Sequence, residues 1–353
     1  MGLLYFVVLL GVIVFIHELG HFLVAKMFHV YVGEFALGMG PKLLSYQGKE
    51  TLYSLRAIPL GGFCQMAGEV GNELEGELEV EVEPERSLKG IAKWKQILIM
   101  VAGILMNFLL AWVIFTGIFV TQGYTVTVDL PKIGSIIENS PAERVGLMPG
   151  DEIVQIEFAD GTIVVPETFS DMSASALANL TASRIYTVER DGKMMTFEVT
   201  PEYMEDQGTY LVGFSAPVEH VQVGLLQGMA DGVSQMAYVT VMMVESILDL
   251  FKGQNLDQIS GPVGIYTVTA EQASLGLTNY IWLIAIISLN VGIVNAIPLP
   301  VLDGGRVVLT VFEMITGKPI NKNIEQALMT IAIVLLLGLM LFATGQDILR
   351  LFK

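Results

Sequence analysis

Long apolar stretches divide this chain into segments that could cross a membrane and a more polar insertion between them. Four windows reach the length of about 20 mostly apolar residues that a membrane-spanning helix needs. They cover residues 3–24, 97–120, 280–300 and 327–342. The first window lacks a basic leading region and a small-residue cleavage site, so we interpret it as a retained span rather than a signal peptide. The pattern predicts a polytopic α-helical membrane protein with about four transmembrane helices.

A further apolar stretch, residues 220–251, is interrupted by acidic side chains. Asp231, Glu245 and Asp249 would lie inside the bilayer if this stretch crossed it, and a charge there costs about 2.5–3.5 kcal/mol. We therefore interpret the stretch as an amphipathic helix on the membrane surface. A fifth span would also reverse the direction in which residues 280–300 cross, against the charge pattern.

Basic residues indicate which loops face the cytoplasm. They follow the first span, precede the second and separate the last two, at Lys26, Lys89, Lys93, Lys95, Arg306, Lys318 and Lys322. The positive-inside rule makes these loops cytoplasmic. The N-terminus and the insertion at 122–277 are then extracytoplasmic, as is the C-terminal tail, where Arg350 and Lys353 oppose the rule weakly.

The insertion has the pattern of a small β-rich domain. Strand-like runs at 124–128, 153–156, 186–190 and 195–199 alternate with turn signals at Asp160-Gly161 and Asp191-Gly192, and one helix is predicted at 173–180. The segment PKIGSIIENSPAERVGLMPGDEIVQI, with Ser140 and Pro141 as a helix start, resembles a PDZ domain of the protease-associated kind. That resemblance implies binding of an extended peptide at a sheet edge. A β-rich spacer without a ligand is the alternative.

Net charge and cysteine content exclude several kinds of partner and site. The 353 residues are 53% hydrophobic with a formal net charge of −17. Because no basic stripe could neutralise phosphates, we expect no nucleic-acid partner. Cys64 is the only cysteine, so an intramolecular disulfide or a cysteine metal cluster is excluded. Glutamates at every second position from Glu73 to Glu85 are interpreted as a solvated run without chemistry.

The first apolar window contains the motif HELGH at 17–21, where an ordinary span would be uniformly apolar. His17 and His21 are four residues apart, so on a helix they share a face and could bind one metal ion. Glu18 is adjacent and could reach a metal-bound water. This is the H-E-x-x-H arrangement of zinc hydrolases, in which the glutamate is the general base. The alternative is a pair of hydrogen-bonded core histidines.

A catalytic zinc usually has three protein ligands, and Asp303 is the candidate for the third. It lies in NAIPLPVLDGGR, at the predicted cytoplasmic end of the window at 280–300, which matches the membrane depth of the histidines. Two glycines follow it and would let the backbone approach closely. Pro298 and Pro300 break the helix there, which a bilayer tolerates only beside protein or a water-filled cavity. The alternative is a helix-end carboxylate that faces the cytosol.

These motifs together resemble the bacterial site-2 proteases, which are intramembrane zinc metalloproteases. The resemblance covers essentially the whole chain. It is carried by HELGH, by GMGPKLLSYQGKETLYSLRAIPLGGFCQMAGE at 38–69, by the PDZ segment, by ISGPVGI at 259–265 and by NAIPLPVLDGG at 295–305.

The resemblance implies roles for individual residues. His17, His21 and Asp303 would bind Zn²⁺, and Glu18 would activate water. Asn295, with Pro298 and Pro300 after it, would help to hold the substrate near the metal. Residues 38–62 would form a membrane-re-entrant β-hairpin whose edge pairs with an unwound substrate helix.

The expected organisation is a series of segments: transmembrane helix 1 at 1–28; the cytoplasmic or re-entrant hairpin region with the acidic loop at 29–96; helix 2 at 97–121; one extracytoplasmic PDZ domain at 122–218; a surface helix and linker at 219–279; helix 3 at 280–305; and helix 4 with its flanking loop and tail at 306–353. The resemblance implies a multi-pass protein of the cell membrane, with its active site toward the cytoplasm. Its substrates would be single-span membrane proteins such as anti-sigma factors and signal-peptide remnants, shortened beforehand by another protease.

Two other functions remain as alternatives. A metal transporter would distribute polar groups along several spans, whereas here they cluster at one depth. A proteolytically inactive membrane scaffold that works through its PDZ domain would not need Glu18 beside two metal-spaced histidines.

Overall fold

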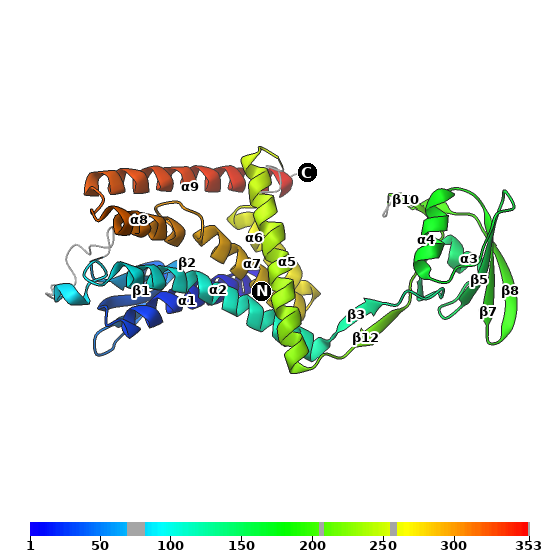
Figure 1. The fold of residues 1–353 in the computed structure, drawn as a ribbon, viewed down its shortest axis with the longest axis horizontal. Helices are drawn as coiled ribbons and strands as arrows, with labels where there is room; N and C mark the ends of the chain where they lie inside the picture. Colours follow the sequence, from blue (N-terminus) through cyan, green and yellow to red (C-terminus); the bar gives the residue numbers. More distant parts are fainter. Residues whose placement is uncertain (69–81, 205–207, 255–259, 352–353) are drawn as a thin grey trace. The chain divides into compact units, whose positions relative to one another are not determined.

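The computed structural model describes residues 1–68, 82–204, 208–254 and 260–351 (Figure 1). The chain divides into two compact units. The first, here the helical unit, combines Met1–Thr121 with Gly224–Lys353, and the second, the β-rich unit, is Gln122–Val223. Most of the acidic run at 73–85 lies outside the described residues.

Five helices of the helical unit are, among the described residues, long and apolar enough to cross a membrane. They are α1 (Gly2–Met27), α2 (Lys93–Gln122), α5 (Leu225–Phe251), α7 (Leu277–Asn295) and α9 (Lys322–Leu351). Two shorter helices, α6 (Pro262–Leu275) and α8 (Asp303–Thr316), lie between them in the sequence. The prolines at 298 and 300 were expected to break the helix within the window at 280–300, and α7 does stop ahead of them, at Asn295; each proline lacks the N–H that a helix requires.

Helix α5 occupies most of the stretch that we interpreted as surface-lying. By length and composition it could span a membrane, so the number of spans stays a prediction. In Figure 1, however, α5 runs across α1, α2 and α9 rather than along them. It is fixed there by the indole N–H of Trp112, which donates to the carbonyl of Met229 over 3.0 Å, and by packing of its Met236 and Met243 in a cluster with α2 and α7.

Helices α1 and α2 pack closely because small residues lie where they cross. The buried positions of α1 recur every three or four residues, which is the stripe of a helix with one buried face. At Gly20, a Cβ atom would come within 2.7 Å of the Ala102 carbonyl carbon on α2. Only a glycine permits that approach. This contact brings the face of α1 that carries the histidines against α2.

A buried carboxylate on α9 contacts the start of α6. Asp347 of α9 accepts hydrogen bonds from the backbone N–H groups of Gly261 and Gly264, over 2.9 and 2.7 Å. A Cβ atom at Gly264 would lie 2.6 Å from the same carboxylate. The glycines of ISGPVGI therefore make room for an acidic cap at the start of α6, where the helix dipole also favours a negative charge.

A long antiparallel hairpin, β1 (Val32–Gln47) and β2 (Leu52–Met66), packs against α1. Its register shifts near Gly38 and Gly40, both at positive φ, which bends a ladder that would otherwise be regular. Glu34 is buried between the strands and accepts hydrogen bonds from Ser54 and Arg56. The hairpin expected from the family resemblance is present; its insertion into the membrane stays a prediction.

The β-rich unit is built around a four-stranded antiparallel sheet. The sheet has the order β6-β5-β7-β8, from β5 (Glu152–Phe158), β6 (Ile163–Val164), β7 (Arg184–Arg190) and β8 (Lys193–Val199). Shorter pairs join β3 (Tyr124–Thr127) to β12 (Val218–Val221), β4 (Ser135–Ile136) to β11 (Phe214–Ser215), and β9 (Glu202–Met204) to β10 (Thr209–Leu211). The unit also contains α3 (Pro141–Val145) and α4 (Phe169–Ala178), which contribute Ala142 and Met172 to its core.

Local chemistry sets the limits of these two helices. Ser140 caps α3 with Pro141 in the first turn, as expected, and Gly146 ends it in the left-handed region. The prediction of a helix at 173–180 is wrong in its bounds: α4 begins at Phe169, because Thr168 and Asp171 form a capping box upstream of the predicted start. Whether the unit is a PDZ domain stays a prediction.

Candidate metal centre

Helix α1 places His17 and His21 on its buried stripe, one turn apart, facing α2. The Nδ1–H of His21 donates to the backbone carbonyl of Ile99 on α2, over 2.8 Å. A carbonyl can only accept, so this bond places a hydrogen on Nδ1, and in the neutral ring Nε2 then carries the lone pair that a metal ion needs. His17 has a different partner: its Nδ1 lies 3.1 Å from Nδ2 of Asn107, also on α2.

Asp303, the first residue of α8, is adjacent to both imidazoles. Its Oδ2 lies 3.1 Å from Nε2 of His17 and 3.3 Å from Nε2 of His21. The three candidate ligand atoms lie within 4.8 Å of one another. Asp303 Oδ2 is buried and, despite these distances, has no well-aligned hydrogen-bond partner among the described residues.

These three residues fit a zinc ion. Two imidazole nitrogens and one carboxylate oxygen converge on one point, and this donor set is the one that catalytic zinc sites use. The orphaned Asp303 oxygen points to the same conclusion, because a buried carboxylate oxygen without a hydrogen bond is costly unless it coordinates a cation.

Glycines make this convergence possible. At Gly103 of α2, an added Cβ would lie 2.6 Å from Cε1 of His21 and 2.9 Å from Cε1 of His17. At Gly304, directly after Asp303, it would overlap the carbonyl of Ala296 at the end of α7. The rings and the Asp303 turn therefore fit only where these positions have no side chain.

The site opens into a cavity of about 340 Å³ between α1, β2 and the turn before α8. Glu18 lines it, and its carboxylate accepts a hydrogen bond from the backbone N–H of Cys64 on β2. Burial raises the pKa of the Cys64 thiol, which keeps the sulfur protonated and disfavours it as a metal ligand. Asn295 also lines the cavity, with Nδ2 3.4 Å from Nε2 of His17.

The two prolines predicted to help to hold the substrate do not line this cavity. Pro298 is exposed in the turn between α7 and α8. Pro300 lines a neighbouring cavity of about 400 Å³, which shares Arg306 with the first. Their role in substrate binding stays a prediction.

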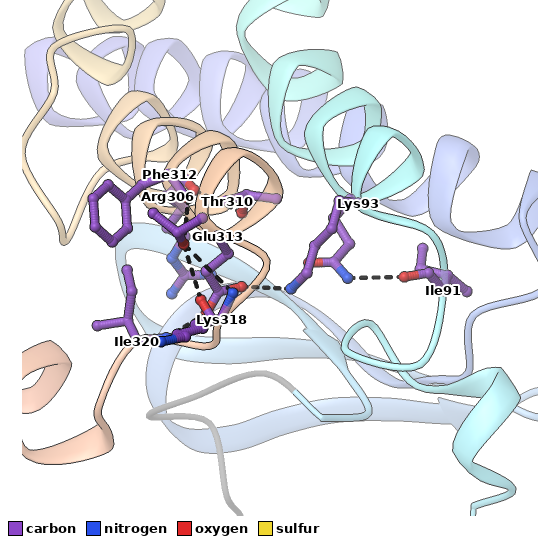
Figure 2. A network of polar contacts seen from close by, with 10 residues as sticks. Ile91, Lys93, Arg306, Thr310, Phe312, Glu313, Lys318 and Ile320 are labelled. Carbon is purple, nitrogen blue, oxygen red and sulfur yellow. Dashed lines mark hydrogen bonds and ion pairs between the residues drawn. The ribbon is translucent and has the colours of Figure 1, made fainter.

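The neighbouring cavity is bordered by an ion pair between α2 and α8. Figure 2 shows Lys93 pointing toward Glu313, which also accepts the backbone N–H of Ile320 over 2.9 Å. Burial works against ionisation of Glu313, but the bonds from Lys93 and Ile320 outweigh it and hold the pKa of Glu313 below its usual value. The carboxylate is therefore charged near neutral pH and links α8 to α2.

Sequence reasoning missed the contribution of α2 to this site. Ile99, Gly103 and Asn107 are spaced by four residues and face the histidines. One signal was available: Asn107 is a lone amide within an apolar span, and polar groups at such positions are often functional. The role of the Ile99 carbonyl has no sequence signature at all.

Comparison with known proteins gives the family. The model of peptidase family M50 matches residues 5–339, and the chain therefore belongs to this family. Among its relatives is the regulator of sigma-W protease RasP of Bacillus subtilis, 31% identical, with 98% of each chain covered. The zinc metalloprotease RasP of Geobacillus kaustophilus is 32% identical, with 98% of this chain and 97% of the relative covered. A zinc metalloprotease RasP of Bacillus licheniformis is 31% identical, with 98% of each chain covered.

Proposed function

We propose that this protein is an intramembrane zinc metalloprotease that cleaves transmembrane helices of single-span proteins. The observation that carries the proposal is the convergence of His17, His21 and Asp303 within 4.8 Å, with Glu18 on the same cavity. Membership of a peptidase family and the names of the relatives, which are zinc metalloproteases, support it.

The chemistry follows from the positions of the side chains. His17, His21 and Asp303 would hold a zinc ion, which would supply a water of lowered pKa and polarise the scissile carbonyl. Glu18 would accept the proton of the attacking water and deliver it to the leaving amine. The Cys64 N–H orients the Glu18 carboxylate toward the cavity, since the donor lies on the hairpin that forms the opposite wall.

Substrate presentation is the role that we assign to β2. A transmembrane helix hides its peptide bonds in its own hydrogen bonds, so the helix must unwind before attack. Gly61, Gly62 and Phe63 of β2 line the cavity, and extended backbone there could pair with an unwound segment. Asn295, beside His17, is placed to hold that segment near the metal.

The substrates that we propose are anti-sigma factors and remnants of signal peptides. The name of the Bacillus subtilis relative, a regulator of sigma-W, supports the first class. We further propose that another protease shortens these substrates first, with the β-rich unit as a PDZ domain that binds or excludes their soluble parts. The extracytoplasmic position of that unit and the cytoplasmic depth of the active site belong to the same proposal.

The test is a comparison of Glu18→Gln with the wild type. Both proteins are reconstituted in proteoliposomes with candidate single-span substrates, and the fragments are identified by mass spectrometry. We expect Glu18→Gln to retain zinc and lose cleavage, because an amide cannot accept the proton of water at neutral pH. Glu245→Gln, an exposed change on α5, is the matched control and should cleave normally. Near-normal turnover by Glu18→Gln would contradict the assignment, and a metal transporter would show zinc uptake without fragments.

A further inference from the structure

The two histidines of the metal centre are held by chemically different partners. His21 Nδ1 faces the Ile99 carbonyl, which can only accept a hydrogen. His17 Nδ1 faces the side-chain amide of Asn107, which can donate through Nδ2 or accept through Oδ1. The tautomer of His21 is therefore fixed by the backbone, whereas that of His17 depends on which end of the Asn107 amide faces the ring.

The Asn107 amide is fully buried, and one of its ends has no partner. Asn107 is 0% exposed, its Nδ2 lies toward His17, and its Oδ1 has no hydrogen-bond partner in the part of the chain that the structure describes. With this orientation, Nδ1 of His17 is an acceptor and the ring hydrogen is on Nε2, which lies 3.3 Å from Nε2 of His21 and 3.1 Å from Oδ2 of Asp303. A metal ion bound at Nε2 requires the other tautomer, in which Nδ1 carries the hydrogen and needs an acceptor.

We infer that Asn107 is the positioning residue for His17: when zinc is bound, its Oδ1 accepts the hydrogen of His17 Nδ1. A half-turn of the amide brings the orphaned oxygen to the ring and needs no movement of the helix. The backbone is already fixed, because the Asn107 carbonyl accepts a hydrogen bond from the Ser288 hydroxyl on α7 over 2.9 Å. The inference rests on the zinc site of the proposed function.

Zinc affinity tests the inference without any assay of cleavage. Full-length wild type, Asn107→Leu and Asn107→Asp are purified in detergent, and zinc is titrated against a chelator of known affinity. Loss of an acceptor for a ligating histidine typically weakens metal binding by about 10–100-fold, and we expect this loss for Asn107→Leu. Asn107→Asp should restore the affinity, because a carboxylate only accepts. Thr269→Ala is the matched control: it removes a buried side-chain hydrogen bond on α6, from the Thr269 hydroxyl to the Ile265 carbonyl, at a residue that does not line the metal site, and its zinc affinity should be unchanged.

The outcomes separate this inference from the proposed function. If the wild type bound no zinc, the proposed function itself would fail. If the wild type and Asn107→Leu bound zinc equally, or if Asn107→Asp folded but bound as weakly as Asn107→Leu, the positioning role would be wrong. Should the aspartate variant fail to fold, nuclear magnetic resonance of ¹⁵N-histidine in the zinc-loaded wild type decides: we expect hydrogen on His17 Nδ1, and a bare Nδ1 would overturn the inference.

Discussion

Gly103→Ala should damage the metal centre more than any substitution of comparable size in α2. The new methyl group would lie 2.6 Å from Cε1 of His21 and 2.9 Å from Cε1 of His17, whereas carbon atoms in contact are normally about 3.5–4.0 Å apart. The rings must therefore move by roughly 1 Å, or α1 and α2 must separate by a similar distance. Metal–ligand distances tolerate only about 0.2 Å.

The magnitude follows from these distances. A displacement of about 1 Å at a reacting centre can cost roughly 100-fold in activity, and overpacking of this kind destabilises a fold by about 1–3 kcal/mol. We expect zinc affinity to fall at least as far as cleavage does, because the methyl group displaces the ligands themselves. Zinc is measured by chelator competition and cleavage in proteoliposomes.

Gly117→Ala provides the control on the same helix. Apart from the neighbouring backbone of α2 itself, no heavy atom of the described residues lies within 4 Å of a Cβ at that position, and both substitutions gain the same helix propensity, about 1 kcal/mol. Gly117→Ala should therefore bind zinc and cleave like the wild type. Wild-type zinc affinity in Gly103→Ala would refute the reasoning, since it would show that the histidines can be displaced without loss of the site.

Two further predictions concern the β-rich unit. Asp151 is almost fully buried, and its carboxylate accepts two hydrogen bonds from Arg190 over 2.6 and 2.7 Å. Burial opposes ionisation of this carboxyl, but the bonds from Arg190 and from the Met148 N–H hold its pKa below the usual value. Because the folded pKa is lowered, the ionised carboxylate stabilises the fold above the unfolded pKa of about 3.9, and this stability is lost as the pH falls below that value. The unfolding temperature of the wild type should therefore fall more in acid than that of Asp151→Asn. Parallel pH profiles of the two unfolding temperatures would contradict this. In the second variant, Asn-Gly replaces residues 128–217 and joins the paired ends of β3 and β12 by a two-residue turn. This variant should still bind zinc, because all three ligands lie in the helical unit. Loss of zinc from a folded deletion variant would show that the β-rich unit supports the site.

The family could be recognised from the sequence because its signals are local. HELGH, NAIPLPVLDGG and the glycine-rich hairpin segment are short motifs with fixed spacing, and the match over residues 5–339 confirms the resemblance to the site-2 proteases. The strands of the β-rich unit were predicted for a similar reason: period-two patterns and turns such as Asp191-Gly192 are encoded in neighbouring residues, and β7 and β8 meet at that turn.

What the sequence could not provide was the contribution of distant backbone. The Ile99 carbonyl holds His21 across 78 residues of sequence, and any residue type could present that oxygen. The role of Gly103 could not be predicted because a glycine in an apolar helix is common. Only the position of the histidine rings opposite it shows why a methyl group is excluded. The apolar window at 280–300 extends past the end of α7 because apolar residues continue beyond Asn295, and the prolines expected to break the helix locate its end only to within a few residues.

The distribution of the ligands along the chain has a consequence for how the enzyme is made. His17 and His21 leave the ribosome at the start of synthesis, whereas Asp303 emerges only after α7 has been completed. A nascent chain therefore carries two of the proposed ligands and Glu18 long before the third proposed ligand has been made. The proposed metal site can be completed only after most of the chain has been translated, so proteolytic activity at this site would begin late in synthesis.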